Sequence, residues 1–135
     1  MLISIIIVMA SIIGYNNLSG ETTPLEFAKK QSGLELPNDL ELENYNDEWQ
    51  DFNGDGYRKI VFRFKEKDFK QLEKECIKRN YSKLPITENG YMPFYLDKND
   101  SGYYKLEFIS KDKNDFMLTV VNFSQSKLFL DIRVQ

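Results

Sequence analysis

The pattern of apolar and polar residues separates the first twenty residues from the rest of the chain. Residues 1–13 (MLISIIIVMASII) are apolar apart from Ser4 and Ser11, and the first charged residue is Glu21. This length suits the ~7–15-residue apolar core of a signal peptide better than a transmembrane helix of ~20 residues. A buried terminal strand is the alternative interpretation. We expect a hydrophobic signal or anchor segment in residues 1–20 and a single domain in residues 21–135.

The first helical signal in this domain is the segment 23–26 (TPLE). It has the form of a capping box, with proline at the first helical position. It predicts a helix over about residues 24–32, ended by Gly33 in the left-handed conformation. The expected buried contacts of this helix are Leu25, Ala28 and Leu34.

A second helical signal begins at Asp68, with Gln71 three residues later as in a capping box. The helix is expected to end at Asn80 or at the Leu84-Pro85 step. Its expected inward-facing residues are Phe69, Leu72, Cys76 and Ile77. We interpret Cys76 as a small core residue, because a reactive cysteine needs an exposed, electropositive setting.

The remaining periodicity is that of β-strands. Residues 57–65 (YRKIVFRFK) alternate most clearly, and residues 40–45 alternate weakly, as in an edge strand. Three further segments follow at hairpin spacing, 103–109, 116–123 and 128–134, and a shorter one at 91–96 precedes them. This order predicts an α+β fold: a mainly antiparallel sheet of about four to six strands, with two helices packed on one face.

Composition limits the chemistry of this domain. The 135 residues include no histidine and a single cysteine, so the usual general base and the usual zinc ligands are missing. The net charge of −3 argues against a nucleic-acid binder, which normally has a basic face. No phosphate loop or nucleophile elbow is present, and no carboxylate pair is singled out. We therefore expect a non-enzymatic protein without a cofactor, calcium excepted.

The segment DFNGDG (residues 51–56) is the most distinctive motif. Oxygen-bearing side chains stand at loop positions 1, 3 and 5 before a glycine, as in the first half of an EF-hand calcium loop and in dockerin-like or integrin-repeat modules. The candidate calcium ligands are Asp51, Asn53, Asp55 and the carbonyl of Tyr57. Lys59 and Phe62 occupy positions where such loops place further acids. We favour the alternative, a turn between strands in which the Asn-Gly and Asp-Gly pairs supply positive φ angles.

Charge is segregated along the chain. Residues 31–57 contain eight acids and no base, whereas residues 58–83 contain ten bases and four acids. One interpretation is an acidic patch for a basic partner protein, around Asp47, Glu48 and Trp49. We favour the alternative, in which the acidic arm and the basic helix lie side by side and neutralise each other. Aromatic residues that could add to a recognition surface, although most must be core, are Tyr91, Tyr95, Tyr103 and Tyr104.

A series of short motifs runs from residue 34 to the C-terminus. They are Leu36-Pro37, Gly54-Asp55-Gly56, the strand at 60–64, Leu84-Pro85, Gly102-Tyr103-Tyr104 and the closing residues 123–132. Their order resembles that of small uncharacterised membrane-anchored or exported proteins of low-GC Gram-positive bacteria. The resemblance implies no activity.

The apolar N-terminus and the lack of catalytic groups favour an extracytoplasmic domain, secreted or membrane-anchored through residues 1–20, that binds a protein or a surface ligand. Cleavage, membrane spanning and a truncated signal stay open, because no Lys or Arg precedes the apolar run and no small-x-small cleavage site follows it. The alternatives are a weak calcium-binding module at the DFNGDG loop and a cytosolic immunity-type protein whose acidic segment covers a basic toxin. A hydrolase with an unrecognised carboxylate pair is more remote.

Overall fold

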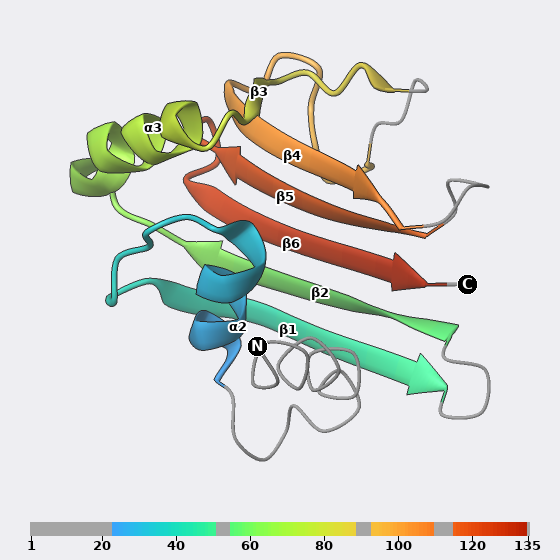
Figure 1. Cartoon of the computed structure of the whole chain (residues 1–135). Coiled ribbons are helices and arrows are strands. Elements are labelled where there is room, and N and C mark those ends of the chain that lie inside the picture. Colours follow the sequence, from blue (N-terminus) through green and yellow to red (C-terminus); the bar gives the residue numbers. More distant parts are fainter. Residues whose placement is uncertain (1–22, 51–54, 89–92, 110–114, 135) are drawn as a thin grey trace, which may run out of the picture.

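The computed structural model describes residues 23–50, 55–88, 93–109 and 115–134 (Figure 1). Among these residues there are two α-helices, α2 (Pro24–Ser32) and α3 (Phe69–Lys78), and a 3-10 turn, η1 (Glu66–Asp68). The strands are β1 (Glu41–Gln50), β2 (Asp55–Arg63), β3 (Ser82–Lys83), β4 (Gly102–Phe108), β5 (Phe116–Asn122) and β6 (Lys127–Val134). They form one sheet in the order β1-β2-β6-β5-β4-β3, with every neighbouring pair antiparallel. The predicted α+β fold, with two helices on one face of an antiparallel sheet, is confirmed (Figure 1).

α2 begins and ends as its sequence predicts. The Thr23 hydroxyl accepts a hydrogen bond from the amide three residues later (3.2 Å), which satisfies one of the N–H groups that a helix start leaves open. Gly33 ends the helix with φ 70°, in the left-handed region. Ala28 and Leu34 are buried as expected, whereas Leu25 is only half-buried.

α3 begins differently from the prediction. The side chain of Asp68 makes no capping hydrogen bond, and the 3-10 turn η1 leads into the helix instead. Gln71, expected to complete the capping box, donates to the carbonyl of Glu35 (2.7 Å). The helix does end before Asn80, which has φ 62°. Ile77 lies outside the inward stripe and is 59% exposed, because it is rotated by about 100° from its buried neighbour in the helix.

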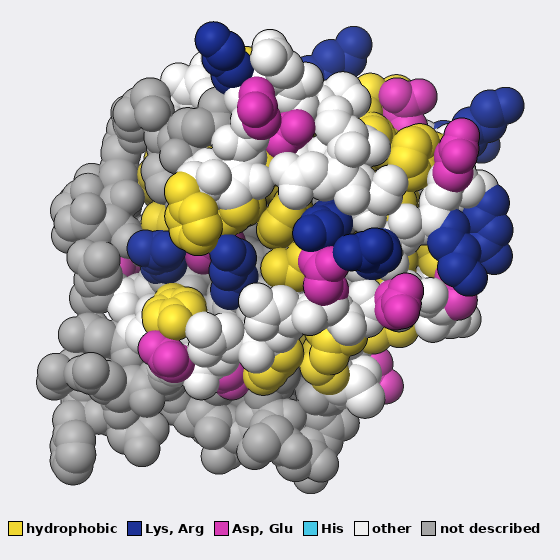
Figure 2. Space-filling view, turned by 180° about the vertical axis from the view of Figure 1, so that it is seen from behind, with side chains coloured by type: hydrophobic (Ala, Val, Ile, Leu, Met, Phe, Trp, Pro, Cys, Tyr) yellow, Lys and Arg dark blue, Asp and Glu magenta, His cyan; other side chains and the backbone are white. Residues whose placement is uncertain are grey.

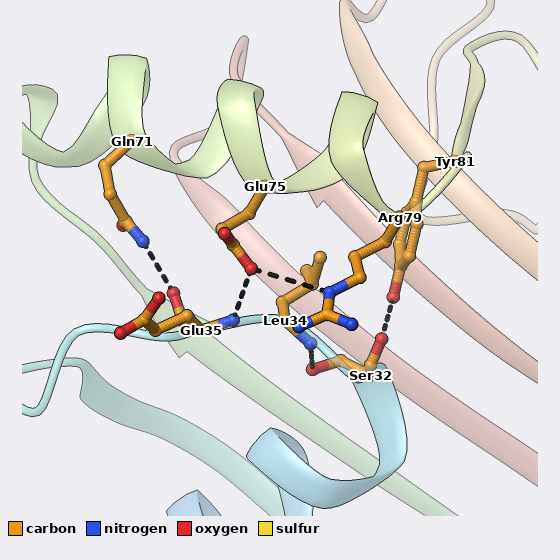
Figure 3. Close-up of polar contacts among 7 residues, drawn as sticks. All are labelled: Ser32, Leu34, Glu35, Gln71, Glu75, Arg79 and Tyr81. Atoms are coloured by element: carbon orange, nitrogen blue, oxygen red, sulfur yellow. Dashed lines mark hydrogen bonds and ion pairs between the residues drawn. The ribbon is translucent and has the colours of Figure 1, made fainter.

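One side of α3 is tied to the chain that leaves α2 (Figure 3). The amide of Glu35 donates to the Glu75 carboxylate (2.9 Å), and Arg79 lies 3.9 Å from the same oxygen. The hydroxyl of Tyr81 donates to the carbonyl of Ser32 (2.6 Å). Glu75 is therefore buried with partners for its charge, and these contacts fix the rotation of α3 about its axis.

The strands follow the predicted pattern except at three places, of which one is the short strand β3, where no strand was predicted. β2, β4, β5 and β6 each begin and end within two residues of the expected positions. β1 is longer than expected, because it stays paired with β2 as far as Gln50 and Asp55. Residues 93–96, expected to be part of a strand, form a turn in which the amide of Leu96 donates to the carbonyl of Pro93 (3.0 Å).

Both faces of the sheet are covered. On the helix-side face, the helices and the chain around them pack on β2, β4, β5 and β6, with a core that includes Phe27, Ala28, Leu72, Cys76, Ile60 and Phe62. On the opposite face, which we call the loop-side face, the connection from β3 to β4 contributes Ile86 and Leu96. These two residues belong to a second cluster with Val61, Val120 and Phe129 of the sheet. The apolar residues that alternate with the helix-side core are thus buried as well.

The N-terminal segment lies outside the described residues. The signal or anchor expected in residues 1–20 therefore stays a prediction. Within the part of the chain that the structure describes, neither helix has the length and apolar character needed to cross a membrane.

Candidate functional site

The predicted calcium loop joins β1 to β2. Asp51, Asn53 and the side chain of Asp55 lie outside what the structure describes. Gly56 lies inside β2, in register with Val134, so the Asp-Gly pair continues a strand where positive φ angles were expected. Among the described residues, no three His, Cys, Asp or Glu side chains are grouped to hold a metal. Calcium binding at the loop itself stays a prediction.

Tyr57, the fourth candidate ligand, lies in β2 opposite Glu48 of β1. Its hydroxyl accepts a hydrogen bond from the amide of Asn46 (2.9 Å). Partial burial and then the neighbouring Glu48 carboxylate raise the pKa of Tyr57 above its ordinary value. These three residues alternate with the helix-side positions of their strands, and therefore belong to the loop-side face.

Asp47 belongs to the opposite, helix-side face. Its carboxylate lies 3.0 Å from the guanidinium of Arg58, which is completely buried. The same guanidinium lies 4.8 Å from the ring centroid of Phe27 on α2. The side chain of Trp49 lies outside the described residues. Of the predicted partner-binding residues, Asp47 and Glu48 therefore face opposite sides of the sheet, and Asp47 is engaged within the domain.

Other acids of the segment 31–57 also pair with bases of the domain. Glu43 forms ion pairs with Arg63 and Lys127, and hydrogen bonds from these two side chains hold the pKa of Glu43 below its ordinary value. Asp39 lies 3.1 Å from Lys67, whose hydrogen bond lowers the pKa of that carboxyl. Neutralisation of the acidic arm is confirmed for these residues. The bases come from β2, β6 and η1, however, and not from the helix as expected.

The loop-side face presents an exposed aromatic residue on a fixed turn. Phe94 follows the buried Pro93 and is 89% exposed. Its neighbour Tyr95 stacks on the ring of Phe129, with 4.6 Å between centroids and 27° between planes. Figure 2, which views the molecule from behind, shows this face with Lys, Arg, Asp and Glu side chains among hydrophobic ones. The buried Pro93 and the stacked Tyr95 thus fix the turn on the sheet, and Phe94 between them is exposed to solvent.

A carboxylate on the same connection fixes the turn further. Asp100 accepts hydrogen bonds from the amide of Asp97 (2.8 Å) and from the side chains of Asn122 (2.9 Å) and Gln125 (3.0 Å). Gln125 also donates to the carbonyl of Tyr95 (3.0 Å). Burial acts to raise the pKa of Asp100, but these hydrogen bonds outweigh it and lower the pKa.

Charged side chains surround the exposed turn. The Lys59 ammonium lies 4.1 Å from the ring centroid of Tyr95 and 5.0 Å from that of Phe94. The Tyr95 hydroxyl donates to Asp131 (2.9 Å), which is only 1% exposed and also lies 3.6 Å from Arg133. We call these five residues the aromatic-cation cluster. It joins an exposed ring, two cations and a buried carboxylate in one arrangement.

No protein-family model, curated protein or solved structure matches this chain. The candidate site therefore stands on geometry alone.

Only part of the aromatic-cation cluster could be predicted from the sequence. Tyr95 was among the expected recognition residues, but Tyr103 and Tyr104 are buried, and Tyr91 lies outside the described residues. Phe94 and Lys59 were missed as site residues. One signal was available: Asp131 is a lone acid inside an apolar strand (LFLDI), which indicates a buried carboxylate with a partner.

Proposed function

We propose that this chain is a non-enzymatic binding domain that contacts a protein partner through the aromatic-cation cluster. The observation that carries the proposal is Phe94, which is the most exposed large hydrophobic residue among those described. Aromatic side chains are enriched at the energetic centres of protein interfaces. A ring already held in place loses little conformational freedom on binding, so more of its burial energy contributes to affinity.

The charges of the cluster favour a partner that carries acidic groups beside an apolar pocket. Lys59 and Arg133 place positive charge beside the exposed ring, and the compensating Asp131 carboxylate is buried beneath them. An approaching surface therefore meets cations and an aromatic ring first. Glu48, an acid expected in the partner site, shares this face of the sheet.

We further propose that the domain acts outside the cytoplasm. The support is the uncharged apolar N-terminus, which has the length of a signal-peptide core. The partner would then be a secreted protein or one at the cell surface.

Site-specific photo-crosslinking in the native cell tests the partner proposal. A benzophenone amino acid replaces Phe94 in the full chain, and the control carries it at Leu42, which is also exposed (47%) but on the helix-side face. We expect a discrete crosslinked protein from position 94 and none of the same mass from position 42.

The crosslinked protein is then purified and its affinity measured. Phe94→Ala should weaken binding by about tenfold or more, the loss typical of truncating an interface anchor, whereas Leu42→Ala should leave the affinity unchanged. Equal affinities for the wild type and Phe94→Ala would contradict the proposal.

A further inference from the structure

The outward side of α3 carries a row of lysines. Leu72 and Cys76 face the sheet, and the side bearing Glu75 and Arg79 faces the chain between α2 and β1 (Figure 3). The sector opposite the core, at ~100° per residue, is left to four exposed residues. We call them the basic ridge: Lys70, Lys74, Ile77 and Lys78.

The basic ridge carries three lysines and no acid of its own. None of its three lysines forms an ion pair among the described residues. Of the two acids of α3, Glu75 is buried against the Glu35 amide, whereas Glu73 is exposed next to Lys74 and lies 3.4 Å from the Tyr103 hydroxyl. Lysines at spacings of four residues add their potentials on one side of a helix.

An apolar side chain lies within this charge. Ile77 is 59% exposed, three residues from Lys74 and next to Lys78. Clustered lysines are attracted to anionic lipid headgroups, and an exposed aliphatic side chain among them adds an apolar group for the headgroup layer. Nucleic-acid contacts are made mainly by polar and charged side chains to phosphates and base edges, so an exposed isoleucine among the lysines is less typical of them. The net charge of −3 also disfavours a nucleic-acid partner.

The place where the described chain begins agrees with a membrane contact on this face. The described chain begins at Thr23, directly before α2, and α2 and α3 pack on the same face of the sheet (Figure 1). An anchor in residues 1–20 would therefore join the domain on the face that carries the basic ridge.

We propose that the basic ridge of α3 docks the domain on an anionic lipid surface. Its lysines contact lipid phosphates and Ile77 enters the headgroup layer. The aromatic-cation cluster lies on the other face of the sheet, so membrane docking leaves it free. This proposal does not depend on the protein partner.

Vesicle binding by the full chain tests this proposal. Phosphatidylcholine vesicles are compared with vesicles that contain phosphatidylglycerol, for the wild type, the triple variant Lys70→Gln/Lys74→Gln/Lys78→Gln and a control of equal charge change, Lys83→Gln/Lys98→Gln/Lys105→Gln. Every protein carries residues 1–20, so a difference between variants isolates the ridge. We expect the ridge variant alone to bind anionic vesicles about tenfold or more weakly, and high salt to remove the difference.

Two further variants sharpen the result. Ile77→Asn should weaken binding to anionic vesicles by a smaller factor, and Phe94→Ala should bind them as the wild type does. Equal binding of the wild type to both kinds of vesicle would overturn the proposal, as would equal losses in the ridge and control variants. Lysine-dependent binding to a single-stranded oligonucleotide without vesicle binding would overturn it in favour of a nucleic-acid partner. Urea unfolding of each variant shows that the domain remains folded.

Discussion

At the scale of single residues, Asp131 is a carboxylate held inside the sheet. Its carboxylate is almost completely buried in β6, between apolar neighbours on the strand. The carboxylate accepts a hydrogen bond from the Tyr95 hydroxyl and forms an ion pair with the Arg133 guanidinium. A buried charge is tolerated only when hydrogen bonds or ions compensate it. The hydrogen bond from Tyr95 to Asp131 therefore stabilises the domain, and it requires Tyr95 and the turn beside it to stay in place.

Tyr95→Phe should therefore destabilise the domain although the ring remains. Removing a hydroxyl that donates to a buried carboxylate is expected to cost about 1.5–3 kcal/mol. Urea unfolding of the two proteins measures the difference. Tyr45→Phe is the matched control, because its hydroxyl also donates to a carboxylate, Asp47 (3.1 Å), but at an exposed site. The control should lose less than about 0.5 kcal/mol, and equal losses would contradict the role given to Asp131.

Cys76 was expected to be a core residue, and its burial confirms this. Burial, with a contribution from Glu75 and Glu73, raises the pKa of the Cys76 thiol from 9.0 to about 12. In the unfolded chain the thiol begins to lose its proton near pH 9, whereas in the folded domain it keeps the proton. Its contribution to stability is therefore present below pH 9 and is lost as pH rises from 9 towards 12.

Urea unfolding between pH 7 and pH 10.5 measures this effect. The wild type should lose stability above pH 9 more steeply than Cys76→Ala, by up to about 1.4 kcal/mol per pH unit. Parallel pH profiles would contradict the pKa assigned to the thiol.

Among the elements, two glycines with positive φ set different constraints. Gly33 ends α2 with φ 70° and open space around the position of a Cβ. Gly102 begins β4 with φ 151°, and a Cβ there would lie 2.0 Å from the carbonyl oxygen of Val121. A Cβ at Gly33 would strain only the backbone, whereas a Cβ at Gly102 would also overlap with the neighbouring strand.

Alanine substitutions should separate these two constraints. Gly33→Ala is expected to cost about 1–2 kcal/mol, the penalty of a left-handed backbone for a residue with a Cβ. Gly102→Ala should cost about 3 kcal/mol or more, since strain and overlap add. Thermal or urea unfolding measures both losses. A Gly102→Ala variant no less stable than Gly33→Ala would contradict the close packing of β4 on β5.

Local signals predicted most elements but not their partners. The ends of α2 depend on neighbouring residues and could be inferred, and the limits of β2 could be inferred to within two residues. The length of β1 could not, because ELENYNDEWQ lacks apolar alternation and is held extended by pairing with β2. The aromatic-cation cluster was missed for a related reason. It forms because β6 pairs with β2 in a register that places Asp131 opposite Lys59, which is a contact between distant parts of the chain.

At the scale of the whole molecule, the two faces of the sheet carry different surfaces. The helix-side face holds the basic ridge of α3, and the loop-side face holds Phe94. Taken together, the two proposals give an orientation in which the basic ridge faces lipid and the aromatic-cation cluster stays available to a protein.

Cell fractionation tests the export on which this orientation depends. We expect the full chain in the membrane fraction or outside the native cell, because residues 1–20 form an uncharged apolar segment. Deletion of residues 1–20 should leave the chain in the cytosol. Recovery of the full chain entirely from the cytosol would contradict export and favour the immunity-type alternative.

The place of β6 in the sheet has a consequence for biogenesis. β6 is the last of the described strands, yet it lies between β2 and β5 and joins the β1–β2 hairpin to the strands β3, β4 and β5. The two parts of the sheet have no common strand until Lys127–Val134 has been synthesised. A nascent chain therefore lacks its central strand until Lys127–Val134 has left the ribosome, and the sheet cannot be completed before then. In the proposed export, this late completion favours the unfolded form that a threading translocase requires.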